Sequence, residues 1–296
     1  MGKSKLILPL LAIGFLAIPA MAASSVVVVT PNNPGGDNFT NPIVGVDAFQ
    51  PIGASGWYYN NVRTQTTIGI TGDYPHDVTG SVYFNATSNG SSTQGKADVE
   101  TFFTPSNYFS LSDLSSLSYD WYRDGSSTVA QHLIPSLRLA IRSTDGTQSG
   151  YIVYEPVYNG GSTAIPVTTD AWVTATIGNN TNLWATGNTL PNNVNVGNAD
   201  TYTTTLGEWQ SAPGNYLVTG ISSGVGSGWN GTFTGAVDNI TLNMANGDST
   251  TYKFELAGAA ATPTPLPASA YGGGVILSLL IGGHLLGRKR ATVKAV

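Results

Sequence analysis

Short β-branched and aromatic runs, separated by turn clusters rich in Asn, Gly and Ser, recur along the middle of this 296-residue chain. They occupy residues 26–29, 68–70, 82–84, 99–103, 117–122, 137–141, 151–154, 172–177, 216–221, 236–242 and 252–256. Several alternate, and in residues 137–141 Arg138 falls on one face and the leucines on the other. Only residues 111–117 and 205–211 indicate short helices. The pattern predicts an all-β fold, an antiparallel β-sandwich of the jelly-roll type.

Cysteine is absent from the chain, which excludes disulfides, Fe–S clusters, thiol nucleophiles and Cys-based zinc sites. Stability must then come from a hydrophobic core. Residues 23–256 are numerous enough to bury a sizeable one. We therefore expect this segment to form a single β-sandwich domain.

The N-terminal segment has the composition of a secretion signal. Lys3 and Lys5 precede an apolar stretch, and Ala20-Met21-Ala22 forms a small-x-small cleavage site. This order of a basic region, an apolar region and a cleavage site is typical of signal peptides. We expect residues 1–22 to be a signal peptide, with an N-terminal membrane helix as the alternative.

The C-terminal segment combines a Pro-rich linker, an apolar run and a basic end. The linker covers residues 257–270, the Gly-studded apolar run covers 271–287, and the tail at 288–296 begins with Arg288-Lys289-Arg290. The apolar run is short for a bilayer, and cations at one end favour the cytoplasmic face. We expect a short transmembrane helix at 271–287.

This order of hinge, apolar run and basic cluster resembles the PEP-CTERM sorting signal of Gram-negative bacteria. Pro265-Leu266-Pro267-Ala268 is similar to the Val-Pro-Leu-Pro-Ala variant of that signal, although Thr264 stands where Val is usual. The resemblance implies an exosortase-type processing enzyme as a partner. It also implies transient passage through the inner membrane and release to the cell surface or into exopolysaccharide, as with other removable hydrophobic tails.

The charge of the chain changes if both terminal segments are removed. The whole chain carries 12 basic and 17 acidic side chains. Six of the basic ones lie in the terminal segments, so residues 23–256 keep six against 17, a net charge of −11. Such an acidic core disfavours nucleic acid and anionic membrane surfaces as partners.

Several segments of the core are similar to a jelly-roll domain of secreted PEP-CTERM proteins, akin to laminin B and carbohydrate-binding jelly rolls. They are residues 118–124, 154–159, 224–229 and 235–242, the last reading Gly-Ala-Val-Asp-Asn-Ile-Thr-Leu. The Val-Asp-Asn closing strand is the commonest hallmark of these domains and does not fix a ligand. The resemblance implies a sandwich that binds an extracellular glycan.

Aromatic side chains are the candidate ligand contacts, because a flat ring matches the C–H face of a sugar. We single out Trp229 in a Gly-rich loop, Trp57 in a Trp-Tyr-Tyr run, and Tyr158. Trp184 is a further candidate. Trp121 lies on an alternating strand pattern, as does Trp172, and both are expected in the core.

A structural Ca²⁺ is the one cofactor that the sequence offers, with Asp238 as its candidate ligand. Ca²⁺ takes six to eight oxygen ligands, and Asp47, Asp120 and Asp124 could contribute some of them. No EF-hand spacing is present. The alternative for Asp238 is a turn-capping role.

Catalytic patterns are sparse. Residues 220–224 match G-x-S-x-G around Ser222, but glycines and not a helix follow, which disfavours a nucleophile elbow. His76 and His132 are the histidines available as a base. A glycosidase needs two carboxylates, for which Glu155 and Glu208 are the best pair. We therefore expect a secreted, surface-sorted, non-enzymatic protein that binds or organises extracellular polysaccharide, with a secreted glycan-active hydrolase as the alternative.

Overall fold

The computed structural model describes residues 22–187, 189–194, 202–256 and 258. The signal peptide (except Ala22), most of the linker, the sorting motif (Pro265 to Ala268), the transmembrane helix and the basic tail (Arg288, Lys289, Arg290) lie outside these residues. Within the described ranges, no helix has the length and apolarity needed to cross a membrane. The described residues from Ala23 onward form one compact unit, which contains every strand described below.

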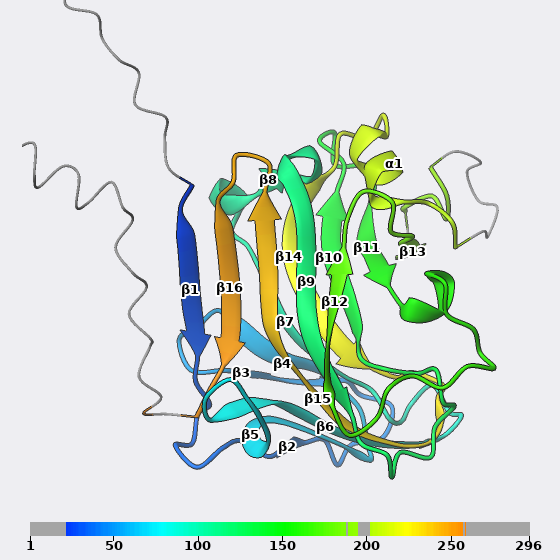
Figure 1. Ribbon diagram of the computed structural model, residues 1–296. Coiled ribbons are helices and arrows are strands. Elements are labelled where there is room, and N and C mark those ends of the chain that lie inside the picture. Colours follow the sequence, from blue (N-terminus) through cyan, green and yellow to red (C-terminus); the bar gives the residue numbers. More distant parts are fainter. Residues whose placement is uncertain (1–21, 188, 195–201, 257, 259–296) are drawn as a thin grey trace, which may run out of the picture. The chain divides into compact units, whose positions relative to one another are not determined.

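Two mostly antiparallel sheets pack face to face, which confirms the all-β sandwich (Figure 1). The first sheet, here called sheet A, contains β1 (Ser24–Val29), β2 (Phe39–Thr40), β5 (Thr66–His76), β6 (Gly80–Asn89), β9 (Leu114–Arg123), β12 (Trp172–Ile177), β15 (Asn230–Met244) and β16 (Ser249–Phe254). The second, sheet B, contains β3 (Ala48–Pro51), β4 (Trp57–Val62), β7 (Ala97–Phe102), β8 (Phe109–Ser110), β10 (Ser136–Arg142), β11 (Ser149–Tyr154), β13 (Trp184–Thr186) and β14 (Leu217–Val225).

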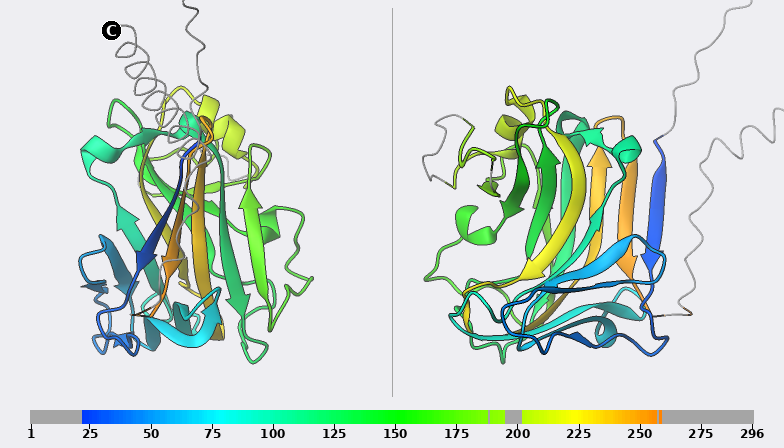
Figure 2. Two further views of the ribbon diagram at one scale, coloured as in Figure 1. Left: turned by 60° about the vertical axis from the view of Figure 1, so that its left-hand side comes forward. Right: turned by 180° about the vertical axis from the view of Figure 1, so that it is seen from behind.

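Strand β15 is a central strand of sheet A. Its first half pairs with β6, its second half pairs with β16, and β9 runs along its other edge. The N-terminal strand β1 adds to β16 in parallel, so the first and last strands of the described chain lie side by side at one edge of the sheet (Figures 1 and 2). This arrangement closes the domain by joining its first and last strands.

Each of the eleven runs predicted as strands overlaps a strand of the structure. The sequence patterns missed β2, β3, β4, β8 and β13. Four of these are only two to four residues long, and β4 contains Asn60-Asn61, a pair more typical of turns.

The two expected helices have different outcomes. The helix at 205–211 is confirmed as α1 (Leu206–Ser211), where Thr205 and Glu208 form a capping box. The prediction of a helix at 111–117 is wrong, because only one 3-10 turn (Leu111–Asp113) forms before β9 begins at Leu114. The Ser110 hydroxyl caps that turn, and Leu114 and Leu117 then point into the core from the strand.

The core lies between the sheets and is rich in aromatic side chains. The largest fully buried ones are those of Trp57, Trp209, Tyr59, Tyr119, Phe84, Phe233 and Phe254. Successive residues of a strand point to opposite faces of the sheet. The strand residues next to these buried ones therefore point away from the core. The outer faces therefore carry the polar and half-exposed aromatic side chains from which a functional site can be built.

Candidate binding groove

A row of aligned residues crosses the outer face of sheet B. Glu100 on β7 lies opposite Ser222 on β14, Ser222 opposite Arg138 on β10, Arg138 opposite Val153 on β11, and Val153 opposite Trp184 on β13. Directly opposed residues of neighbouring strands have side chains on the same face. Five strands thus bring an acid, a base and an indole into one line.

Arg138 is the centre of this face. Its Nη1 donates to Asp98 Oδ1 at 2.7 Å, and its Nε donates to Ser136 Oγ at 2.9 Å. The side chain of Asp98 is completely buried and receives two further donors, Asn61 Nδ2 at 2.8 Å and Lys96 Nζ at 3.5 Å. A buried carboxylate with paired charges and hydrogen bonds is fixed in place, so this cluster makes a rigid floor.

Gly224 makes the room for this ion pair. It lies opposite Asp98 in the ladder between β14 and β7. A Cβ added there would meet Asp98 Oδ1 at 2.0 Å. A side chain at this position would push the carboxylate away from Arg138.

Glu100 extends the cluster toward β4 and β11. Asn60 donates to one carboxylate oxygen of Glu100, and the Tyr151 hydroxyl lies 3.4 Å from the other. Burial and the nearby charge of Asp98 raise the pKa of Glu100, although Asn60 and Arg138 oppose the rise. The same burial raises the pKa of the Tyr151 hydroxyl, which therefore remains a donor at neutral pH.

An open groove of about 430 Å³ lies over this floor. Its lining includes Arg138, Asp98 and Tyr151 below and the indoles of Trp184 and Trp229 as aromatic walls. Both tryptophans are half-buried and line the groove. A concave site with a few fixed polar groups among aromatic rings is typical of small-molecule and saccharide binding.

Glu155 brings a further carboxylate to the groove. It directly follows β11, and its Oε2 accepts a hydrogen bond from Trp184 Nε1 at 3.0 Å. Burial raises the pKa of Glu155, and the indole N–H opposes that rise. This hydrogen bond fixes the orientation of the Trp184 ring at the groove wall.

The three predicted ligand contacts lie in three different environments. Trp229 lines the groove, with its ring edge-on to Phe233 at 5.5 Å. Trp57 is wrong as a ligand contact, because it is 1% exposed and packs against Tyr252 and Phe254 in the core. Tyr158 does not line the groove; its ring stacks on Tyr202 at 4.3 Å.

The two tryptophans expected in the core also differ. Trp121 is buried, as expected. Trp172, one strand further out, is only half-buried on the outer face of sheet A, and its ring lies 4.4 Å from that of His76. The edge position of β12 leaves that face uncovered.

The pair Glu155 and Glu208 is not brought together in the groove. Glu208 Oε2 accepts from the backbone N–H of Thr205 at 2.7 Å and from its hydroxyl, so this carboxylate caps α1. Ser222 is a buried residue in the middle of β14, and the strand continues through it without the sharp turn of a nucleophile elbow.

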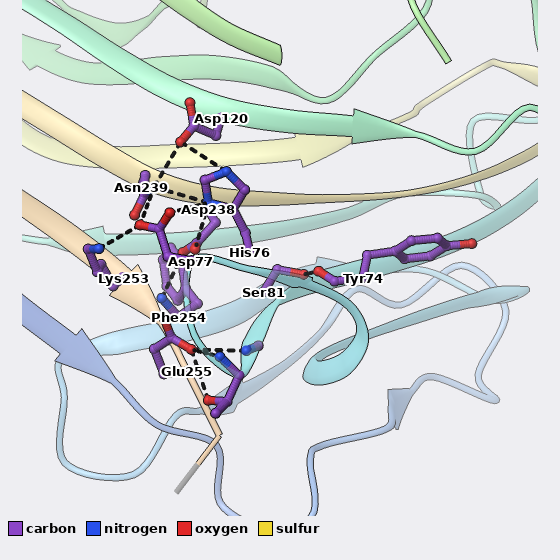
Figure 3. A network of polar contacts seen from close by, with 12 residues as sticks. Tyr74, His76, Asp77, Ser81, Asp120, Asp238, Asn239, Lys253, Phe254 and Glu255 are labelled. Carbon is purple, nitrogen blue, oxygen red and sulfur yellow. Dashed lines mark hydrogen bonds and ion pairs between the residues drawn. The ribbon is translucent and has the colours of Figure 1, made fainter. Parts of the chain in front are cut away.

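Asp238, the candidate Ca²⁺ ligand, belongs to a closed polar network on sheet A (Figure 3). It is fully buried, its Oδ1 accepts from the Phe254 N–H at 2.9 Å, and its Oδ2 lies 3.5 Å from His76 Nδ1. In the part of the chain that the structure describes, no three His, Asp or Glu side chains are placed to hold a metal ion. Asp47, Asp120 and Asp124 bond to protein groups instead.

His76 is the centre of this second network. Asp77, Asp120 and Asp238 all place carboxylate oxygens 3.5 to 3.7 Å from its ring nitrogens. Asn239 Nδ2 bridges Asp77 and Asp120 at 2.9 and 2.8 Å, and Lys253 Nζ pairs with Asp77 at 2.6 Å (Figure 3). The hydrogen bond to Asp238 and the nearby carboxylates raise the pKa of His76 against its burial. Burial raises the pKa of Asp238 to about 6.

The groove residues that the sequence patterns did not single out include Asp98, Lys96 and Tyr151, and Glu100 beside them was not singled out either. The sequence did contain one indication of them, because residues 97–100 alternate apolar and acidic side chains as a strand with one polar face does. Arg138 was placed on an outward face by the same pattern. What the sequence could not supply was the alignment of these strands.

No family model matches the chain, and no curated protein matches it. Among solved structures, it is similar to a carbohydrate-binding module of the β-sandwich superfamily (14% identity, TM-score 0.34), covering 70% of this chain and 56% of that one. It is also similar to a β-1,2-glucanase from Parabacteroides distasonis (15%, 0.34; 73% of this chain, 24% of that one) and a family 11 xylanase from Neocallimastix patriciarum (11%, 0.31; 71% and 100%). The chain thus spans little more than half of the first and a quarter of the second, and likeness at these TM-scores carries no argument about function.

Proposed function

We propose that this protein is a secreted, surface-sorted β-sandwich of the jelly-roll type that binds extracellular polysaccharide in the groove of sheet B without cleaving it. One observation carries the proposal. The groove has two aromatic walls, Trp184 and Trp229, above a floor of fixed hydrogen-bonding groups around Arg138. Aromatic faces accept the C–H face of a sugar, while the floor accepts its hydroxyl groups.

The state of the carboxylates favours binding over cleavage. A glycosidase needs one carboxyl group to act as an acid and another to attack the sugar or activate water. Asp98 is fully buried, and its two oxygens already accept from Arg138, Lys96 and Asn61. A carboxylate held in this way is better suited to the floor of a binding site than to the role of a reacting group.

A pull-down with insoluble polysaccharides tests the binding. The full-length protein should be retained, and Trp184→Ala or Trp229→Ala should weaken retention about tenfold, equivalent to ~1.4 kcal/mol. Phe49→Ala removes an aromatic ring that is 67% exposed but does not line the groove, and it serves as the matched control. Retention that is unchanged in both tryptophan variants would rule out the groove as the binding site.

One observation favours the hydrolase alternative. Glu155 and Asp98 line the same groove, and the raised pKa of Glu155 is the property expected of a general acid. In that case, incubation with polysaccharide would release reducing ends. Glu155→Gln would abolish the release while the Trp184 hydrogen bond could still form to the amide oxygen.

We further propose that the terminal segments direct export. The supporting features are the Ala20-Met21-Ala22 site and the hinge at Pro265 followed by the basic cluster. Processing by a signal peptidase and an exosortase-type enzyme would leave a surface protein lacking residues 1–22 and the tail after about Pro267. Intact mass of the surface-released protein tests this, and recovery of the full-length chain firmly in the inner membrane would contradict it.

A further inference from the structure

A second row of aligned residues crosses the outer face of sheet A, on the far side of the sandwich from the groove. Tyr83 on β6 lies opposite Ala236 on β15, Ala236 lies opposite Tyr122 on β9, and Tyr122 lies opposite Trp172 on β12. These aligned positions share one face of the sheet. Tyr83, Tyr122 and Trp172 are all half-buried, so each leaves part of its ring accessible.

Tyr74 closes the gap that Ala236 leaves in this row. It lies near the end of β5, and its ring is 6.0 Å from that of Tyr83 and 4.6 Å from that of Tyr122. Its hydroxyl donates to Asp124 at 2.6 Å, and its carbonyl accepts from Ser81 at 2.5 Å. The four rings of Tyr83, Tyr74, Tyr122 and Trp172 therefore form one continuous aromatic strip.

A polar groove of about 620 Å³ opens at the Tyr83 end of the strip. Tyr83 itself lines it, together with the hydrogen-bonding side chains of Thr67, Thr71, Asp73 and Asn85. Ring surface and hydrogen-bonding groups thus adjoin each other, as they do in the groove of sheet B. This is the combination that an extended chain of sugar units would contact.

The charge around the strip is negative. Burial raises the pKa of the Tyr83 and Tyr122 hydroxyls, and nearby carboxylates add to the rise. These are Asp73 and Asp124 for Tyr83, and Asp170 and Asp124 for Tyr122. The bonds that Asp124 accepts from Ser126 and Tyr74 lower its pKa, so it is ionised at neutral pH.

His76 contacts Trp172, but Asp77, Asp120 and Asp238 surround it and offset its charge. Carboxylates beside aromatic faces favour a cationic ligand and disfavour an anionic one.

We propose that the aromatic strip on sheet A is a second glycan-binding site, specific for polysaccharide that carries free amino groups. The rings stack on the sugars, and Asp73, Asp124 and Asp170 pair with the ammonium groups. This goes beyond the groove proposed above, because the two sites lie on opposite sheets and use different residues. A domain with both sites joins two polysaccharide chains.

The test measures binding of the full-length protein to soluble glucosamine oligomers, with N-acetylglucosamine oligomers of the same length as the uncharged comparison. The unsubstituted oligomer should bind at least about tenfold more tightly, equivalent to ~1.4 kcal/mol. Tyr122→Ala or Trp172→Ala should lower its affinity by a similar factor. Trp184→Ala should leave it unchanged while it reduces retention on polysaccharide bound in the groove, so the two sites fail independently.

Two further variants keep the test decisive if truncation disturbs folding. Tyr122→Phe keeps the ring and should keep the affinity. Asp73→Asn with Asp170→Asn keeps the shape of the site and should reduce the preference for the amino form, with Asp124 as the carboxylate that remains; Asn tolerates the positive φ of Asp170. Equal affinity for both oligomers, or an unchanged preference in the double Asp variant, would overturn the proposal.

Discussion

The groove cluster around Arg138 and the network around His76 are built from similar residues but differ in what surrounds their central cation. Arg138 remains charged at all physiological pH values, and it lies on the floor of an open groove. His76 changes its charge with pH, its pKa is raised by its hydrogen bond to Asp238 and by the nearby carboxylates, and it is enclosed by three carboxylates, Trp172 and Asn239. The first cluster therefore presents fixed polar groups to an open groove, while the second joins β5, β9, β15 and β16 through contacts whose strength depends on pH.

Replacing the central cation of the groove should have the largest effect. Arg138→Met leaves Asp98 buried without its main partner, and breaking a buried pair costs about 3 kcal/mol. We expect the melting temperature to fall by roughly 6–12 °C and retention on polysaccharide to be lost. Arg142→Met, at the exposed end of the same strand, is the control and should change neither quantity. A small shift for Arg138→Met would show that the cluster is not a fixed floor.

Removing the titrating group of the second network should give a smaller, pH-dependent effect. The pKa values of His76 and Asp238 are both raised by folding, so the folded state holds these protons more tightly than the unfolded state. Their contribution to the free energy of unfolding is present at low pH. It is lost as pH rises, from the ordinary value of 3.8 to about 6 for Asp238 and above 6.5 for His76.

Thermal melting between pH 5 and 8 measures this contribution. The melting temperature should fall by roughly 2–8 °C across that range, which corresponds to ~1–2 kcal/mol. Glu100 and Glu155 also have raised pKa values and act in the same direction, so the informative quantity is the difference from His76→Gln. A His76→Gln curve parallel to that of the unmodified protein would contradict a titrating role for the network.

Removing the N-terminal cap of α1 should have the smallest effect on the melting temperature, and it tests a part of the molecule outside both regions. Thr205→Ala removes the hydroxyl that accepts from Glu208 N–H in the capping box of α1. Loss of such a cap costs about 1 kcal/mol, which lowers the melting temperature by roughly 2–4 °C. Polysaccharide retention should not change. A loss of retention in Thr205→Ala or Glu208→Gln would connect α1 to the groove, whose described lining includes neither residue.

The sequence predicted the strands better than it predicted the site. Alternation along residues 137–141 correctly placed a strand, because Leu137, Leu139 and Ile141 are buried while Arg138 lies on the other face. The same rule explains the error at Trp57, since in a Trp-Tyr-Tyr run Trp57 and Tyr59 point inward and only Tyr58 points outward.

The groove itself depends on strand alignment. Arg138 and Asp98 are 40 positions apart in the chain, and Trp184 and Glu155 are 29 apart. Each of these pairs meets only because several strands pair in one particular register. Residue patterns give the face on which a side chain lies, but a single sequence does not give the partner strand.

The central claim is that the groove binds polysaccharide and leaves it intact. The most direct measurement incubates the full-length protein with a polysaccharide that it retains and follows both the chain length of the polymer and the release of reducing ends. We predict retention, an unchanged chain length and no reducing ends, with the same result for Glu155→Gln. Reducing ends that accumulate with the unmodified protein and disappear in Glu155→Gln would contradict the claim and identify the groove as the active site of a hydrolase.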